Sequence, residues 1–187
     1  KFDIPVIPSR VPTTGIEFIE FAVDENASNE LTKILLSMSF RKERTHLNKD
    51  VVLWRQGAIN IVINKEKYGY AHEAFEAHGA IVCDMGLRVQ NADETVSRAK
   101  SLGSKSFIQN VGLGELNIPA VRGVGGTIVH FIDENSDLHR VWDIEFDRTN
   151  DVEAIQPIGL RRIDHVAQTM RYDEMQDWLL YYISTFE

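Results

Sequence analysis

The chain has 187 residues, 43% hydrophobic and 26% charged, which is enough for one globular domain and the beginning of another. Its formal net charge of -8 argues against nucleic acids and anionic membranes as partners, because both bind basic surfaces. No apolar run approaches the roughly 20 residues that span a bilayer, and the first dozen residues lack the basic start and continuous apolar core of a signal peptide. Cys83 is the one cysteine, so no internal disulfide is possible and a cytoplasmic location is expected.

The N-terminal segment is rich in proline. Pro5, Pro8 and Pro12 are three of the five prolines in the sequence. Proline fixes its own backbone angle and lacks an N–H donor, so residues 1–14 are predicted to form an extended linker. Because the first residue is Lys1 and not methionine, we expect the chain to be cut from a longer one.

Three strand-then-helix openings follow one another along the chain. The first unit is predicted as a strand at 16–23, a helix at 28–38 and strands at 51–54 and 59–63. The second is a strand at 81–89, a helix at 92–102 and strands at 105–109, 118–121 and 127–132, closed by a strand at 141–146. After a polar connection at 147–159, a strand at 162–170 and a helix at 172–186 begin a third. This internal repeat predicts an α+β fold of paired βαβββ modules.

The predicted C-terminal helix has a continuous apolar face. Its members recur at helical spacing: Met175, Trp178, Leu179, Tyr182, Ile183 and Phe186. Burying each such side chain is worth roughly 1.5 to 3 kcal/mol, so the face needs a partner. The partner is the preceding domain, another subunit, or a continuation of the chain beyond Glu187.

The three openings align on short motifs, which are "IEF" at 19–21, "CDM" at 83–85 and "IDH" at 163–165. This alignment makes Phe21, Met85 and His165 equivalent. Together with "GIEFIEFAVD", "LWRQGAINIVIN", "ELNIPAVRGVGGT" and the stretch beginning "IDHVAQTM", the pattern resembles bacterial 4-hydroxyphenylpyruvate dioxygenase. The resemblance covers its N-terminal half and the start of its second half. It implies the glyoxalase-like half-barrel of the vicinal oxygen chelate superfamily over residues 15–146, with the first strand and helix of a second such domain over 160–187.

The resemblance also implies where iron binds. In that family Fe(II) is held in the C-terminal domain by two histidines and one glutamate, a ligand set suited to non-haem oxygenases. The first histidine maps to His165, and the other two ligands have no counterpart in this sequence. In the N-terminal domain Phe21, Met85 and Phe131 fall at the ligand positions. We therefore expect that domain to bind no cofactor and its central space to be filled with side chains or dry.

The implied function is that of a portion of an Fe(II)-dependent 4-hydroxyphenylpyruvate dioxygenase-like protein. The intact enzyme decarboxylates a small aromatic α-keto acid and hydroxylates its ring to give homogentisate, and the family suggests a homo-oligomer. The wording "HVAQTM" followed by "YDEM" is more similar to the dioxygenase-like region fused behind bacterial 3-dehydroshikimate dehydratase, which is the alternative. A second alternative is a small-molecule-binding module without a redox role.

Several other residues have a simpler interpretation. His72 and His78 are six residues apart and face different sides of a helix, so they do not share a metal. Asp133 and Glu134 are predicted to form an acidic surface turn, not a calcium site. Cys83 is predicted to be a buried thiol, because no base lies near it in sequence.

Overall fold

The computed structural model describes residues 7–149 and 155–186, and within them the predicted duplication is present. The first module comprises β1 (Thr13–Ala22), α1 (Glu25–Ser37), β2 (Arg41–His46), β3 (Val51–Gln56) and β4 (Ile59–Asn64). Helix α2 (Gly69–His78) leads to the second, which comprises β5 (Ile81–Val89), α3 (Ala92–Ser101), β6 (Ser106–Phe107), β7 (Ala120–Arg122) and β8 (Ile128–Ile132). The chain continues through α4 (Val141–Ile144), β9 (Phe146–Arg148) and α5 (Met175–Thr185).

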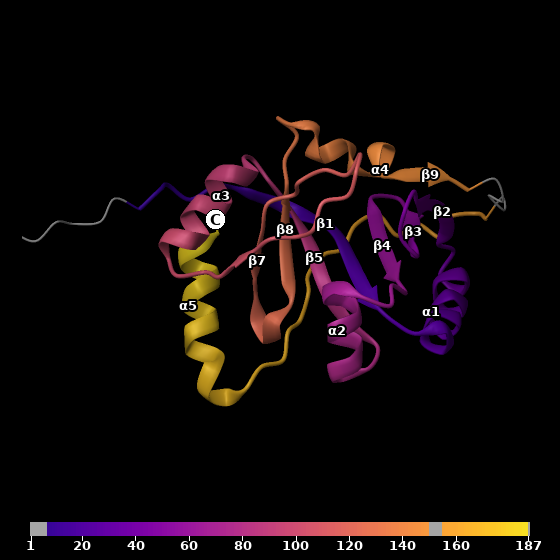
Figure 1. Ribbon diagram of the computed structural model, residues 1–187, viewed down its shortest axis with the longest axis horizontal. Coiled ribbons are helices and arrows are strands. Elements are labelled where there is room, and N and C mark those ends of the chain that lie inside the picture. The colour runs from indigo at the N-terminus through magenta and orange to yellow at the C-terminus, as the bar shows by residue number, and fades with distance from the viewer. Residues whose placement is uncertain (1–6, 150–154, 187) are drawn as a thin grey trace, which may run out of the picture.

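The strands form one mixed sheet in the order β6-β7-β8-β5-β1-β4-β3-β2-β9. At its centre β1 and β5 run antiparallel, and each pairs on its other side with the last strand of its own module in parallel, β4 or β8. The two modules therefore have the same pairing pattern, with β1 and β5 at the junction. Figure 1 shows this arrangement, with α1 near one end of the sheet and α3 and α5 near the other.

Alternating side chains divide the sheet into two faces. On one face α1 covers an apolar cluster that includes Leu35, Trp54 and Ile63, and α3 covers a second that includes Val96 and Phe131. Period-two alternation sends the intervening residues to the opposite face. That face curves around a cavity.

Side-chain caps fix the starts of both crossover helices. Asp24 accepts a hydrogen bond from the amide of Ala27 at 2.8 Å, and Asn91 accepts one from the amide of Glu94 at 3.0 Å. Such caps satisfy amides that have no partner inside the helix and are worth about 1 kcal/mol each. Helix α1 consequently begins at Glu25, three residues before its predicted start.

The segment predicted as a closing strand at 141–146 is different in the structure. Residues Val141–Ile144 form a short helix and only Phe146–Arg148 pair, with β2. The guanidinium of Arg44 donates to the carbonyl of Trp142 at 2.8 Å and, more weakly, to that of Phe146 at 3.4 Å. These long-range hydrogen bonds connect the carbonyls of Trp142 and Phe146 to β2 through the Arg44 side chain.

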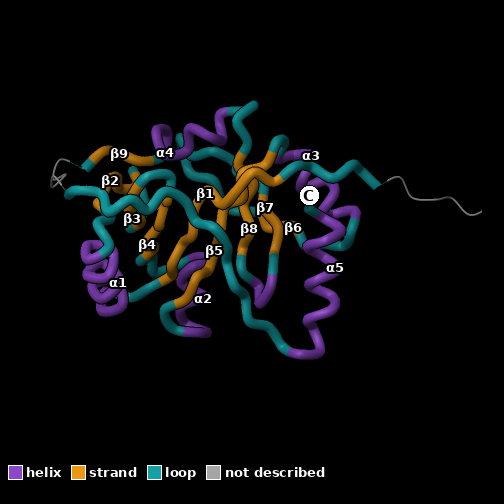
Figure 2. Tube along the Cα trace, turned by 180° about the vertical axis from the view of Figure 1, so that it is seen from behind, coloured by secondary structure: helices purple, strands orange, loops and turns teal. Residues whose placement is uncertain are grey.

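The strand predicted at 162–170 does not form within the described residues. The segment crosses the sheet in extended form toward α5, as Figure 2 shows, and is held by the turn between β3 and β4. The amide of Ala58 donates to the carbonyl of Arg161 at 3.0 Å, and a Cβ on Gly57 would lie 2.7 Å from the carbonyl oxygen of Leu160. A strand needs a neighbour for its backbone groups, and no described strand lies alongside this one.

Helix α5 buries only part of its predicted apolar face. Trp178, Tyr182 and Phe186 are half-buried, and Phe186 packs against the α3 cluster. Arg98 on α3 holds the end of α5 through a hydrogen bond from its Nε to the carbonyl of Ser184 at 2.9 Å. Leu179 on the other side remains 55% exposed. The preceding domain is thus one partner of the helix, and part of the face stays open.

None of the helices in the described ranges combines the length and apolarity that a membrane crossing requires.

Candidate functional site

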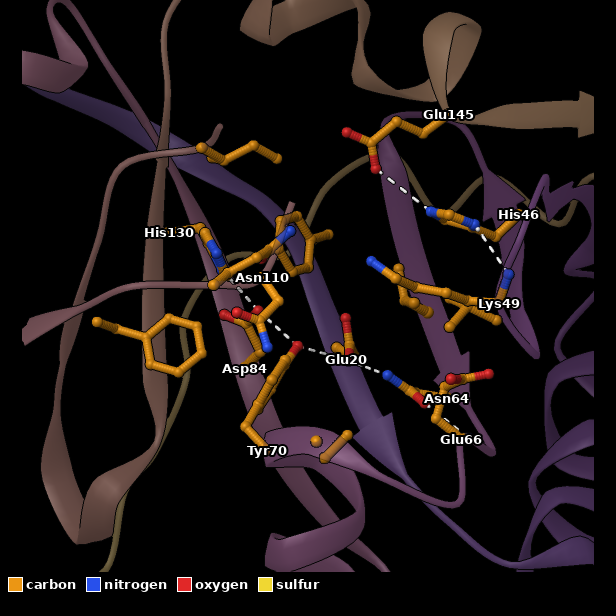
Figure 3. A pocket seen from close by; sticks show the side chains of 18 of the residues that line it. Glu20, His46, Lys49, Asn64, Glu66, Tyr70, Asp84, Asn110, His130 and Glu145 are labelled. Atoms are coloured by element: carbon orange, nitrogen blue, oxygen red, sulfur yellow. Dashed lines mark hydrogen bonds and ion pairs between the residues drawn. The ribbon is translucent and has the colours of Figure 1, made fainter. Parts of the chain in front are cut away.

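A cavity of about 440 Å³ lies on the concave face of the sheet, and residues from both modules line it (Figure 3). Its polar walls include Glu20, His46, Lys49, Asn64, Tyr70, Asp84, Asn110, His130 and Glu145, and its apolar walls include Phe18, Val62, Phe107, Ile118, Trp142 and Phe146. Of the two expected alternatives, a space filled with side chains is therefore wrong, and a dry space stays a prediction. A volume of this size is in the range that binds small molecules.

Four polar side chains form two matching pairs on the four central strands. Asn64 on β4 donates a hydrogen bond to Glu20 on β1 at 2.8 Å. In the second module Asp84 on β5 accepts one from Nδ1 of His130 on β8 at 2.6 Å. Glu20 and Asp84 face each other across the β1–β5 junction as register partners. The repeat of the fold thus produces a repeat of the polar pairs.

Tyr70 on α2 connects the two pairs. Its hydroxyl lies 2.8 Å from Oε1 of Glu20 and 3.1 Å from Oδ2 of Asp84. A hydroxyl has a single proton, so it donates to one carboxylate at a time. The remaining lone pairs of the two carboxylates are left for another donor.

The burial of these groups changes their proton affinities. Loss of solvent, followed by the charge of Asp84, raises the pKa of Glu20 above its ordinary value. Loss of solvent alone would lower the pKa of His130, but the charge of Asp84 and the hydrogen bond to it raise the pKa overall. His130 therefore holds its proton more tightly than a free imidazole does.

A second buried cluster lies on the far side of the cavity (Figure 3). Nδ1 of His46 accepts hydrogen bonds from the amides of Asn48 and Lys49 at 3.1 and 3.2 Å, so the proton of a neutral ring is on Nε2. That nitrogen lies 3.4 Å from Glu145 and 3.7 Å from Glu115, and Lys49 pairs with Glu115 at 2.8 Å.

The structure corrects the predicted ligand-equivalent positions by one residue. Phe21 packs against the α1 cluster, and Met85 and Phe131 lie in the α3 cluster, all away from the cavity. Glu20, Asp84 and His130 face the cavity instead. A shift of one residue along a strand moves every side chain to the other face, and the motif alignment made this shift.

When the motif alignment is shifted by one residue, the three equivalent motifs are "FIE" at 18–20, "VCD" at 82–84 and "IDH" at 163–165. Each now ends on a polar side chain, Glu20, Asp84 or His165. An acidic residue flanked by apolar residues on a strand was the sequence signal for the first two, although each strand carries a second charged residue, Glu17 or Arg88. It was overlooked because the family motif drew attention to the next position.

His165 itself is on the extended segment between the turn at Gly57 and α5. Its side chain is 82% exposed, and its Nδ1 lies 3.2 Å from Asp164 Oδ2. It lines neither the cavity nor any cluster of metal-binding side chains among the described residues.

The other residues considered from sequence have structural surroundings. His78 is exposed at the end of α2 and His72 is half-buried on the same helix. Asp133 was predicted to lie on the surface, but it is buried, with 6% exposure. It accepts hydrogen bonds from the amides of Ala92 and Ser136. Cys83 is buried as predicted, and burial raises the pKa of its thiol, which removes it as a nucleophile.

Two kinds of characterised protein are similar in sequence. A 3-dehydroshikimate dehydratase of Pseudomonas aeruginosa is 38% identical over 173 residues, which cover 92% of this chain and 27% of the dehydratase. A 4-hydroxyphenylpyruvate dioxygenase of the same species is 33% identical over 174 residues, which cover 92% of this chain and 48% of the dioxygenase. The chain thus spans about a quarter of one relative and about half of the other.

The fold has a close counterpart among solved structures. A xylose isomerase-like TIM barrel/4-hydroxyphenylpyruvate dioxygenase fusion protein superposes with a TM-score of 0.86 at 36% identity, over 97% of this chain and 28% of that chain. The family model described as hydroxyphenylpyruvate dioxygenase, HPPD, N-terminal, matches residues 8–147. The βαβββ pair, its half-barrel cavity and this match together identify the chain as a member of the hydroxyphenylpyruvate dioxygenase N-terminal family.

Proposed function

We propose that this chain is the N-terminal domain, with the beginning of the catalytic domain, of an Fe(II)-dependent 4-hydroxyphenylpyruvate dioxygenase-like protein. The supporting observation is that His165, in the corrected motif alignment, corresponds to Glu20 and Asp84, which face the cavity. In this proposal residues 1–14 are a linker, 15–146 the N-terminal domain, 147–159 a connection and 160–187 the start of the catalytic domain.

His165 fits the role of one iron ligand. Its Nδ1 lies next to Asp164, which leaves Nε2 for a metal and orients the ring. Residues 7–149 and 155–186 hold no group of three or more His, Cys, Asp or Glu side chains placed to bind a metal. A second histidine and a glutamate would therefore come from further sequence. When bound, Fe(II) supplies the chelation of an α-keto acid and the activation of O2 that decarboxylation and ring hydroxylation need.

The partners in this proposal are a small aromatic α-keto acid and further copies of the same chain. Part of α5 supports self-association, because the side chains of Met175, Leu179, Leu180 and Ile183 are each more than half exposed. The lone buried Cys83 supports a reducing cytoplasm as the location.

The test is the iron content of the full-length protein. His165→Ala should lower bound iron to a small fraction of the wild-type level while the melting temperature of the N-terminal domain stays the same, because this side chain is exposed. His78→Gln, another exposed histidine, is the matched control and should retain iron. Undiminished iron in His165→Ala would remove the assignment.

A second candidate is the dioxygenase-like region of a bifunctional 3-dehydroshikimate dehydratase. The higher identity to the dehydratase and the similarity to a barrel-dioxygenase fusion favour it. Full-length protein should then turn over 3-dehydroshikimate, whereas the main proposal predicts oxygen uptake with Fe(II), ascorbate and 4-hydroxyphenylpyruvate. If the parental sequence has neither a histidine opening a later strand nor a glutamate closing one, a binding module without redox chemistry is favoured over both.

A further inference from the structure

We propose that the cavity of the N-terminal domain binds a small organic amine that carries an aromatic group. The inference does not depend on the proposed function, because the cavity is built only from residues before Asp147. Three independent features support it: unpartnered buried polar atoms, the balance of charge, and the aromatic walls.

The first feature is an unmet hydrogen-bonding capacity. Asp84 is 1% exposed and His130 is 3% exposed. Within the described part of the chain, Oδ1 of Asp84 and Nε2 of His130 have no hydrogen-bond partner. An ammonium group can donate to the Asp84 oxygen, whereas Nε2 of a protonated His130 needs an acceptor such as an ordered water. Buried polar atoms without partners are costly, so a ligand or ordered water that supplied them would be favoured. Figure 3 shows both side chains directed toward the cavity.

The second feature is an excess of carboxylates. Five carboxylates line the cavity, Glu20, Glu66, Glu73, Asp84 and Glu145, against two permanent cations, Lys49 and Arg122, and two histidines, His46 and His130. Lys49 is already paired with Glu115. A ligand with a negative charge would meet repulsion, whereas an ammonium group would relieve it.

The most favourable place for the ammonium group is beside Glu20 and Asp84, next to the Tyr70 hydroxyl that already bridges them. These residues are register partners, and their mutual repulsion contributes to the raised pKa of Glu20. An ammonium group carries three donors and accepts none. Placed there, it would donate to both carboxylates and stabilise their ionised forms.

The third feature is the aromatic walls. Phe18 and Trp142 meet edge to face with ring centroids 5.7 Å apart, and Tyr70 and Phe107 meet likewise at 5.3 Å. Aromatic faces attract cations and bury flat apolar groups. The cavity therefore offers an acidic position for the amine and an aromatic enclosure for the rest of the molecule.

Three isosteric probes test the proposal on the full-length protein by calorimetric titration. Phenethylamine is the cation, 2-phenylethanol the neutral molecule and 3-phenylpropionate the anion. We expect phenethylamine to bind at least about tenfold more tightly than either of the others. Equal or tighter binding of the alcohol or the acid, or no binding of the amine at about 10 mM, would overturn the proposal.

Two variants locate the site. Asp84→Asn and Glu20→Gln keep the shape of each side chain and remove its charge, and each should weaken phenethylamine binding at least about tenfold. Glu134→Gln is the matched control because Glu134 is an exposed acid outside the lining. If the variants fold and bind phenethylamine with unchanged affinity, the assignment of the site is contradicted. If neither variant folds, the relative affinities of the three probes for the wild-type protein test the proposal.

Discussion

Nδ1 of His130 lies 2.6 Å from Oδ2 of Asp84, and neither side chain has meaningful contact with solvent. The residues are 46 positions apart in sequence and are joined by the parallel pairing of β5 with β8, in which Gly86 is the register partner of His130. The pair therefore depends on the complete second module. The protonation of His130 in this pair therefore contributes to the free energy of unfolding.

The raised pKa of His130 predicts a pH-dependent stability. A group that binds its proton more tightly when folded stabilises the protein fully below its ordinary pKa of 6.5, and this contribution is lost as the pH rises through the folded value. The free energy of unfolding should thus fall as the pH rises above 6.5. Urea titrations of His130→Gln should show a smaller fall, and His78→Gln should behave as wild type. Identical slopes in all three would refute the prediction.

Gly86 is predicted to be required by the ring of Phe18. A Cβ at Gly86 would lie 2.4 Å from two ring carbons of Phe18, well inside contact distance. Gly86→Ala should lower the free energy of unfolding by about 1–3 kcal/mol, the usual cost of overpacking. Combined with Phe18→Leu, the same change should cost less than it does alone, which a double-mutant cycle measures. Strictly additive losses would show that the two positions do not interact.

Arg98 is predicted to fasten the end of α5. Its guanidinium donates to the carbonyls of Ser184 and Pro8, so one side chain on α3 holds segments from both ends of the chain. Arg98→Ala should increase amide hydrogen exchange and proteolytic cleavage in α5 while the sheet stays protected. Lys100→Ala, an exposed basic residue on the same helix, should have no such effect. Protection of α5 unchanged by Arg98→Ala would contradict this role.

Asp133 is predicted to stabilise the start of α3 and the turn after β8. Burial would raise its pKa, but hydrogen bonds from Ala92 and Ser136 outweigh that effect and lower the pKa below its ordinary value of 3.8. Asp133→Ala should cost about 1–3 kcal/mol above that pH, since it leaves buried amides unpaired. The lowered pKa means that the contribution is lost as acid protonates the folded carboxyl, so the difference from wild type should shrink in stronger acid. Glu134→Ala is the neighbouring control in denaturant titrations, and a loss as large as that of Asp133→Ala would contradict the assignment.

The duplicated pattern was predictable because most of its strands and helices carry a clear apolar period. β5 was predicted with its observed ends, and β1, β3, β4, β8, α1 and α3 within a few residues. β2 was missed because "RKERTH" contains no aliphatic or aromatic core residue. It becomes a strand only because β3 and β9 pair with it on its two sides, which is long-range information.

The candidate site was predicted less well than the fold. The sequence located the right strands, but a motif alignment does not determine which face a residue occupies, and a one-residue error exchanged Glu20 for Phe21. Tyr70 was missed with the whole of α2, whose N-terminus has no side-chain cap. The contact of Tyr70 with Glu20 and Asp84 joins residues that are distant in sequence, so no local sequence pattern predicts it.

The β1–β5 junction has a consequence for how the domain unfolds. If either module opened alone, the other would present a ten- or nine-residue central strand as a bare edge, with Glu20 or Asp84 losing its counterpart. Exposed edges of this kind invite pairing between chains. We therefore expect the two halves to unfold as one cooperative unit.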